Sequence, residues 1–202
     1  MTFIGLGFIT GLSLILAIGA QNVFVIEQGI KKQFVFLVCL ICSCSDLLLI
    51  FLGIFLFEYF QTYFNNQIQL ILNLLLIIFL LYFIYTKVRE QNKKVNLNIN
   101  ITASSYKVVV LKTLGFTYLN PHVYSDTVFF LGNFSKNFNF LDKVSFGVGA
   151  SIASFIFFFV LGYASNYFSK FLNNEKVWKF INSFIILFMI GIIIYIILDI
   201  FN

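Results

Sequence analysis

Two short polar segments interrupt otherwise apolar stretches of this chain, and their side chains are suited to binding a small polar molecule. One covers residues 19–22 (Gly-Ala-Gln-Asn) and the other residues 119–122 (Leu-Asn-Pro-His), in a chain of 202 residues. Polar interruptions at corresponding places in two halves of a chain are typical of the binding sites of membrane transporters. The pair therefore predicts one binding site to which both halves contribute.

The second interruption carries the clearer backbone signal. Pro121 has no N–H, and its ring crowds the carbonyl of Thr117, so a helix must open there. Asn120 can donate and accept hydrogen bonds, and His122 can do either depending on its tautomer. The half-helix that follows Pro121 would point its positive end at a ligand, which suits a carboxylate.

The first interruption depends on amide side chains rather than on proline. Gly19 loosens the backbone, and Gln21 and Asn22 follow it directly. At membrane depth an unpaired polar group costs several kcal/mol, so these amides need partners. Either they bond to neighbouring helices or they bind a substrate; two interruptions in matching positions favour the substrate.

Two acids lie inside apolar stretches. Asp46 is about a dozen residues into its stretch, which at ~1.5 Å per residue brings it near the middle of a bilayer. Cys39, Cys42, Ser43 and Gly53 share its helical face. We therefore expect Asp46 to face the protein interior. Asp126 follows His122 by one turn, and the sequence does not determine its distance from Asp46.

Neither acid has an evident counter-charge, because no Lys or Arg lies deep in an apolar stretch. Each acid is therefore either protonated, as desolvation favours, or the partner of a cation from outside the chain. A neutral carboxyl that bonds neighbouring helices together is the simpler alternative. If a cation binds, Asp46 is the residue that we expect to exchange it for a proton.

The elements that position these residues follow from composition. Hydrophobic residues make up 60% of the chain and charged residues 10%, which excludes an ordinary soluble domain. The apolar stretches are long enough for membrane-spanning helices, and strands of a β-barrel would alternate instead. They cover residues 3–18 with 23–26, 34–57, 68–86, 108–131, 144–164 and 180–201. We predict an all-α membrane protein with six transmembrane helices.

Charge predicts the orientation of these helices. Eleven of the thirteen Lys and Arg residues lie near three connections, which the positive-inside rule assigns to the cytoplasm, with both termini outside. The net charge of +5 needs no nucleic-acid partner. Three helices per half then run in opposite directions as a 3+3 inverted repeat. Residues 1–87 form the first repeat, 88–106 a basic cytoplasmic connection and 107–202 the second repeat, within one transporter domain.

Four segments carry recognisable motifs: residues 19–33 (GAQNVFVIEQGIKKQ), 45–53 (SDLLLIFLG), 117–132 (TYLNPHVYSDTVFFLG) and 176–182 (KVWKFIN). Together they resemble the lysine exporter (LysE) family. Their order and spacing match its lysine/arginine exporter branch across the whole chain. Two positions depart from the pattern: Ala20 replaces a proline, and Tyr118 replaces a tryptophan.

The resemblance implies export of L-arginine or L-lysine across a bacterial inner membrane, driven by the proton-motive force. The substrate-binding residues that it carries over match position by position, His122 less firmly than the others: Gln21, Asn22, Asp46, Asn120, Pro121, His122 and Asp126. The partners are then a cationic amino acid, protons and the bilayer. The choice between arginine and lysine as substrate stays open, as does export of other amino acids. A homo-oligomer is compatible with the sequence.

The main alternative is a divalent-metal exporter. Cys39, Cys42, Cys44 and Asp46 form a C-x-x-C-x-D pattern of plausible soft-metal ligands. Against it, Cys44 and Asp46 fall on opposite helical faces, and the chain has one His. A thiol–disulfide carrier is disfavoured because all three cysteines lie in one stretch. With no nucleotide or phosphate-binding motif and no catalytic triad away from lipid, we expect no enzyme, no cofactor and no metal.

Overall fold

The structure, a computed structural model, describes residues 2–16, 19–63, 66–92, 105–169 and 175–201. Every regular element in these ranges is helical, so the all-α prediction is confirmed for them. The helices are α1 (Thr2–Ile15), α2 (Ala20–Lys31), α3 (Val35–Tyr63), α4 (Asn66–Asn92), α5 (Tyr106–Tyr118), α6 (Pro121–Tyr124), the π-helix η1 (Ser125–Phe130), α7 (Leu131–Ser135), α8 (Phe140–Phe168) and α9 (Glu175–Phe201).

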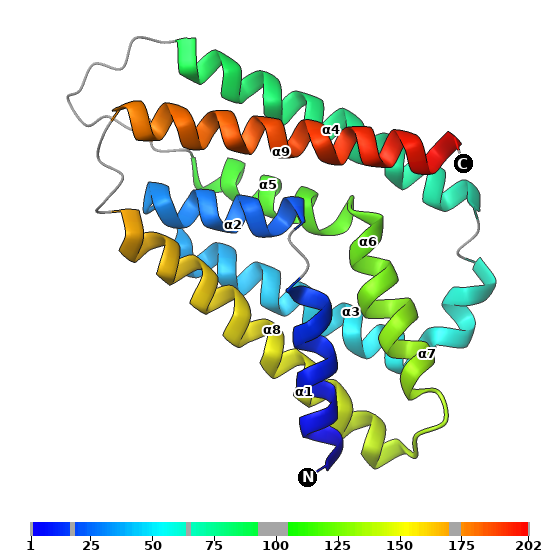
Figure 1. Cartoon of the computed structure of the whole chain (residues 1–202). Helices are drawn as coiled ribbons and strands as arrows, with labels where there is room; N and C mark the ends of the chain where they lie inside the picture. Colours follow the sequence, from blue (N-terminus) through cyan, green and yellow to red (C-terminus); the bar gives the residue numbers. More distant parts are fainter. Residues whose placement is uncertain (1, 17–18, 64–65, 93–104, 170–174, 202) are drawn as a thin grey trace.

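Both predicted interruptions are breaks between helices. The axis turns by 83° between α1 and α2. In the second half the chain leaves α5 and continues through α6, η1 and α7 in a different direction (Figure 1). A polar segment with a glycine or proline therefore ended a helix in each half, as the residue types predict.

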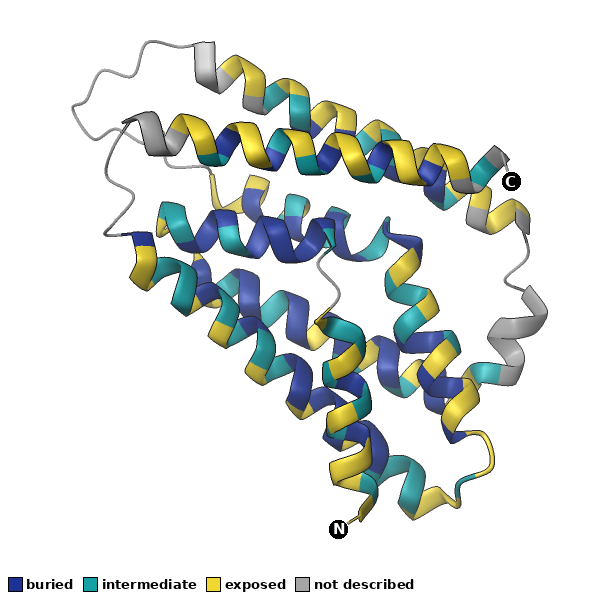
Figure 2. Ribbon diagram, in the orientation of Figure 1, coloured by how far each residue is buried: buried dark blue, intermediate teal, exposed yellow. Residues whose placement is uncertain are grey.

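Three described helical segments are long and apolar enough to cross a membrane: Val35–Phe57, Phe140–Phe168 and Lys179–Leu198. The bent pair of α1 and α2 is a fourth candidate, and α4 contributes the shorter apolar segment Leu70–Thr86. The outer faces of α4 and α9 are lined with exposed residues (Figure 2), many of them large and apolar, such as Phe180 and Leu187. Such faces are expected to meet lipid. The count of six spans and their orientation remain predictions.

Helix pairing follows a reciprocal pattern. Helix α3 of the first half packs on α8 of the second half. In the same way, the last helix of the first half, α4, packs on the last helix of the second half, α9. The broken helix of each half packs on the second helix of the other half, with α1 and α2 on α8, and η1 and α7 on α3. In Figure 1, α4 and α9 lie side by side at one edge of the molecule.

Glycines permit the closest of these approaches. A Cβ atom on Gly53 of α3 would lie 2.5 Å from the Cα atom of Val128 in η1. A Cβ atom on Gly132 of α7 would lie 2.6 Å from the carbonyl oxygen of Gly53. Real side chains do not tolerate such distances, so both positions need a hydrogen in place of a side chain. Small residues at helix interfaces are typical of membrane helices.

Candidate functional site

The first break is held together by an amide side chain. Asn22 Nδ2 donates to the carbonyl oxygen of Ile15 across 3.2 Å, so it serves an acceptor at the end of α1. Gly19 precedes α2 in an extended conformation, and no side chain caps this helix. Asn22, predicted as a substrate ligand, therefore has a structural bond within the break.

The second break satisfies itself to a larger extent. Asn120 caps α6, since its side-chain oxygen accepts from the backbone N–H of His122 across 3.1 Å. Pro121 occupies the first helical position and has no N–H to offer. The hydroxyl of Tyr124 donates to the carbonyl oxygen of Tyr118 across 2.9 Å. We expected the N-terminus of α6 to present free N–H donors to a ligand. The Asn120 side chain instead already accepts from the N–H of His122.

A π-helix follows the second break. Its first residues include Asp126 and Thr127, and the Thr127 hydroxyl donates to the carbonyl oxygen of Val123 across 2.6 Å. π-Helical turns inside α-helices are frequent at functional sites. Nothing in the sequence indicates this turn.

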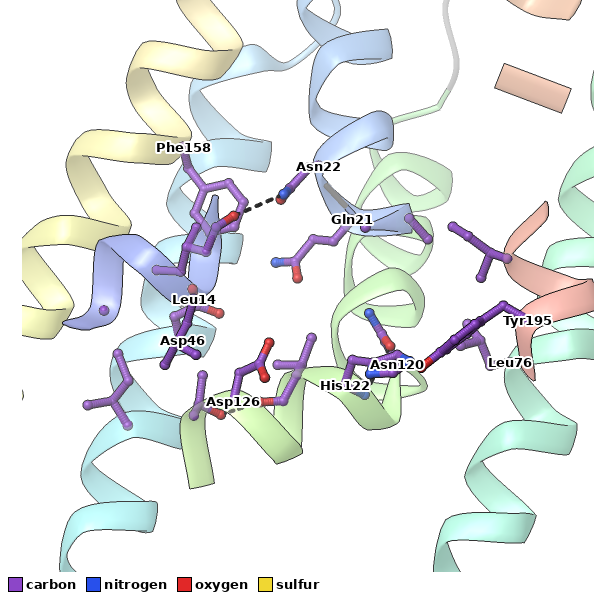
Figure 3. Close-up of a pocket in the computed structure, with 18 of the residues that line it drawn as sticks. Leu14, Gln21, Asn22, Asp46, Leu76, Asn120, His122, Asp126, Phe158 and Tyr195 are labelled. Carbon is purple, nitrogen blue, oxygen red and sulfur yellow. Dashed lines mark hydrogen bonds between the residues drawn. The ribbon is translucent and has the colours of Figure 1, made fainter. Parts of the chain in front are cut away.

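The two breaks and both acids surround one cavity of about 580 Å³ (Figure 3). This volume falls within the ~300–1,000 Å³ common for small-molecule sites. Six of the seven predicted site residues line it: Gln21, Asn22, Asp46, Asn120, His122 and Asp126. The seventh, Pro121, is buried at the start of α6 and shapes the break without being part of the wall. Asp46 and Asp126, of undetermined separation in the sequence, thus share one cavity.

Asp46 has a partner that the sequence did not reveal. The hydroxyl of Ser154 on α8 donates to Asp46 Oδ2 across 2.8 Å, and Ser154 is fully buried. Asp46 is 3% exposed. A serine in an apolar stretch rich in small residues predicts close helix packing, but not which residue it contacts. The bond fixes one carboxylate oxygen while the residue also faces the cavity.

Gln21 has an unsatisfied amide in the cavity. Its side chain is 6% exposed, and its Nε2 atom has no hydrogen-bond partner. Figure 3 shows the side chain extending from α2 into the cavity. Leaving a buried donor unpaired costs roughly 1–3 kcal/mol, so this atom is poised to bind something that the cavity admits.

The α9 side of the cavity was not predicted. Phe188, Gly191, Ile192 and Tyr195 contribute to its lining. The ring centroid of Tyr195 lies 5.6 Å from that of His122, so the two rings approach each other from α9 and α6 (Figure 3). These residues lie in an apolar stretch in which every turn looks alike, so the sequence offers no signal for the turns that face the cavity.

None of the cysteines lines the cavity, although Cys42 neighbours the side chain of Gln21, which does. Cys39 and Cys42 are buried, whereas Cys44 is exposed on the other side of α3. The Cys39 thiol donates to the carbonyl oxygen of Phe158 across 3.1 Å. Within the described ranges, no three His, Cys, Asp or Glu residues gather closely enough to hold a metal ion.

Comparisons with known proteins agree on one family. The family model described as LysE type translocator matches residues 12–199. The chain is 32% identical over 187 residues to a protein named arginine exporter protein ArgO from Pectobacterium carotovorum, covering 92% of each chain. It is 31% identical over 205 residues to one named lysine exporter LysE from Corynebacterium diphtheriae, covering 87% of this chain and 90% of the relative. No solved structure matches the chain.

Proposed function

Because the chain belongs to the LysE type translocator family, we propose that it exports L-arginine or L-lysine from the cytoplasm in exchange for protons. The observation that carries this proposal is the pair of acids, Asp46 and Asp126, in one cavity. Among the described residues that line this cavity, none is Lys or Arg. A cationic amino acid supplies the charge that the wall lacks.

Asp46 is the residue best suited to the substrate cation. It is buried, so any charge on it must be balanced by a nearby opposite charge. Ser154 engages Oδ2, and the residue faces the cavity as well. Asp126 lines the same cavity from η1 and can assist.

The same carboxylate offers a route for coupling. Moving one positive charge out against an inside-negative potential costs ~2.3 kcal/mol per 100 mV, so concentrative export needs a coupled flow. A proton and the substrate cation compete for Asp46, and each is carried in the direction opposite to the other. If the cavity opens in turn to the cytoplasm and to the outside, this competition for one carboxylate is sufficient for antiport.

The proposed topology is a 3+3 inverted repeat with both termini outside. In Figure 1, the last residues of α2, α4 and α8 and the first residues of α5 and α9 gather at one end of the molecule. These are the ends next to most of the Lys and Arg residues, which favours this end as cytoplasmic. The reciprocal pairing of α3 with α8 and of α4 with α9 supports the repeat.

A buried aromatic cluster is a suitable inner gate. The ring of Phe116 on α5 lies 4.8 Å from that of Phe24 on α2, 4.8 Å from Phe79 and 5.0 Å from Phe83 on α4. All four residues lie on the proposed cytoplasmic side of the breaks. In the proposed topology, entry from the cytoplasm would require these rings to part.

The proposal locates the chain in the inner membrane of a bacterium as a multi-pass protein. The named relatives come from bacteria, and export from the cytoplasm begins at this membrane. The proposed partners are the amino acid, protons and lipid.

Efflux from preloaded cells tests the function. Exporter-deleted bacteria would carry the wild-type chain, Asp46→Asn or Asp142→Asn, and release of radiolabelled arginine and lysine would be followed with and without a protonophore. Asp142 is a matched control because it is an acid at the start of α8 outside the cavity.

We expect uncoupler-sensitive efflux from the wild type and Asp142→Asn, and at least a tenfold slower rate from Asp46→Asn. Absence of arginine and lysine efflux, despite membrane expression, would reject the proposal and turn attention to other amino acids or metal ions.

A further inference from the structure

The N-terminus of α2 opens into the cavity. Gly19, Ala20, Gln21 and Asn22 all line the wall. The first backbone bond of α2 runs from the N–H of Val23 to the carbonyl oxygen of Gly19 across 3.2 Å. The N–H groups of Ala20 and Gln21 have no partner inside the helix. With no side chain capping it, α2 directs these donors and its positive dipole end at the cavity.

A second, independent observation points to the same ligand chemistry. The Gln21 side chain is only 6% exposed, and its Nε2 donor has no hydrogen-bond partner. Its side chain extends into the cavity in Figure 3. The Gln21 amide donor lies beside the unpaired backbone N–H groups of Ala20 and Gln21, so this end of α2 calls for a hydrogen-bond acceptor, and an anion is the strongest one.

The other break does not offer the same donors. At α6 the Asn120 side chain occupies the N–H of His122, and Pro121 has none. The two breaks thus differ: one is capped by its own residue and the other is open. Of the two breaks, only the one at α2 therefore leaves backbone N–H groups, those of Ala20 and Gln21, without a partner.

We propose that the N-terminus of α2, together with Gln21 Nε2, binds the α-carboxylate of the transported amino acid. This inference rests on the proposed function and deepens it. The acids Asp46 and Asp126 attract the positive groups of the substrate, whereas α2 selects for the negative one. The substrate class is then cationic α-amino acids, and diamines or metal ions, which have no carboxylate, are excluded.

Analogues without a carboxylate test this assignment directly. Displacement of radiolabelled lysine from the purified full-length protein would be measured with lysine, lysinamide and cadaverine, the diamine that remains when lysine loses its carboxylate. The variants are Gln21→Leu and the control Gln28→Leu. Gln28 is a buried glutamine on the same helix that does not line the cavity.

We expect lysinamide and cadaverine to bind at least 100-fold more weakly than lysine. Gln21→Leu should weaken lysine binding about tenfold, in line with loss of a hydrogen bond to a charged group, while cadaverine binding and Gln28→Leu stay unchanged.

Equal affinity for lysine and cadaverine in the wild type would overturn the inference and leave the exporter proposal standing. That comparison needs no variant, so it holds even if Gln21→Leu fails to fold. Absence of any lysine or arginine binding would instead overturn the proposed function, and this inference with it.

Discussion

Ser154 on α8 donates a hydrogen bond to Asp46, and its removal should loosen the proposed cation site. Loss of the 2.8 Å bond in Ser154→Ala frees the carboxylate to rotate, so we expect a five- to tenfold weaker affinity for lysine with a smaller change in maximal rate. Equilibrium binding and initial efflux rates measure the two quantities separately.

Ser151→Ala is the control for this change. Ser151 is also a buried serine on α8, but its hydroxyl bonds the carbonyl oxygen of Gly147 in its own helix across 2.8 Å. Equal effects of the two substitutions on lysine affinity would show that Ser154 acts on packing alone.

The cysteines should be dispensable. Buried Cys39 and Cys42 behave as small apolar residues, and Cys44 is exposed. Replacing all three by Ala should leave at least half of the efflux activity, measured in the same cells at matched expression. An inactive but well-folded triple variant would revive a metal or thiol mechanism.

Polar residues that line the cavity were conspicuous in the sequence, because each stands in an apolar stretch. Gln21, Asp46 and Asp126 were found in this way, and they line the cavity. Gly191 and Tyr195 were missed because they resemble their neighbours in α9. The partner of Asp46 depends on how α3 meets α8, which no local pattern encodes.

Close packing between α3 and the second broken helix depends on Gly53. A methyl group there would enter the backbone of η1. We expect Gly53→Ala to lower stability by roughly 1–3 kcal/mol, since overpacking outweighs the gain in helix propensity. Thermal unfolding in detergent measures the change.

Gly5→Ala provides the comparison, because nothing lies within 4 Å of a Cβ atom at Gly5 on α1. The same methyl group should there be neutral or slightly stabilising. A destabilisation shared by both variants would argue that helix propensity, and not contact with η1, controls the response.

The breaks were the most predictable elements. Proline and glycine act locally on the backbone, so their consequences follow from the residues around Pro121 and Gly19. The π-helix and the cap by Asn120 were not predictable, since each requires the surrounding helices to hold a particular backbone geometry. Because Asn120 caps α6, we propose the first break, and not the second as expected from the sequence, as the place of the carboxylate donors.

The all-α class of the whole molecule was predicted correctly for the described residues, whereas the six-span 3+3 repeat remains a prediction and its orientation depends on charge alone. Single cysteines at Asn137 and Lys32, introduced into the cysteine-free chain, test it. Both positions are exposed, Asn137 between α7 and α8 and Lys32 at the end of α2. A membrane-impermeant maleimide should label Asn137→Cys in intact cells and label Lys32→Cys only after the membrane is opened. The reverse pattern would invert the proposed topology and make the transporter face the other way.

The central claim is that a cationic amino acid and a proton exchange through one cavity. It is tested most directly with purified protein in liposomes loaded with radiolabelled lysine and a pH indicator, under an imposed gradient with acid outside. We predict that the gradient accelerates lysine release and that the lumen acidifies in step with it, with both effects absent in Asp46→Asn. Lysine release that ignores the gradient and moves no protons would contradict the account.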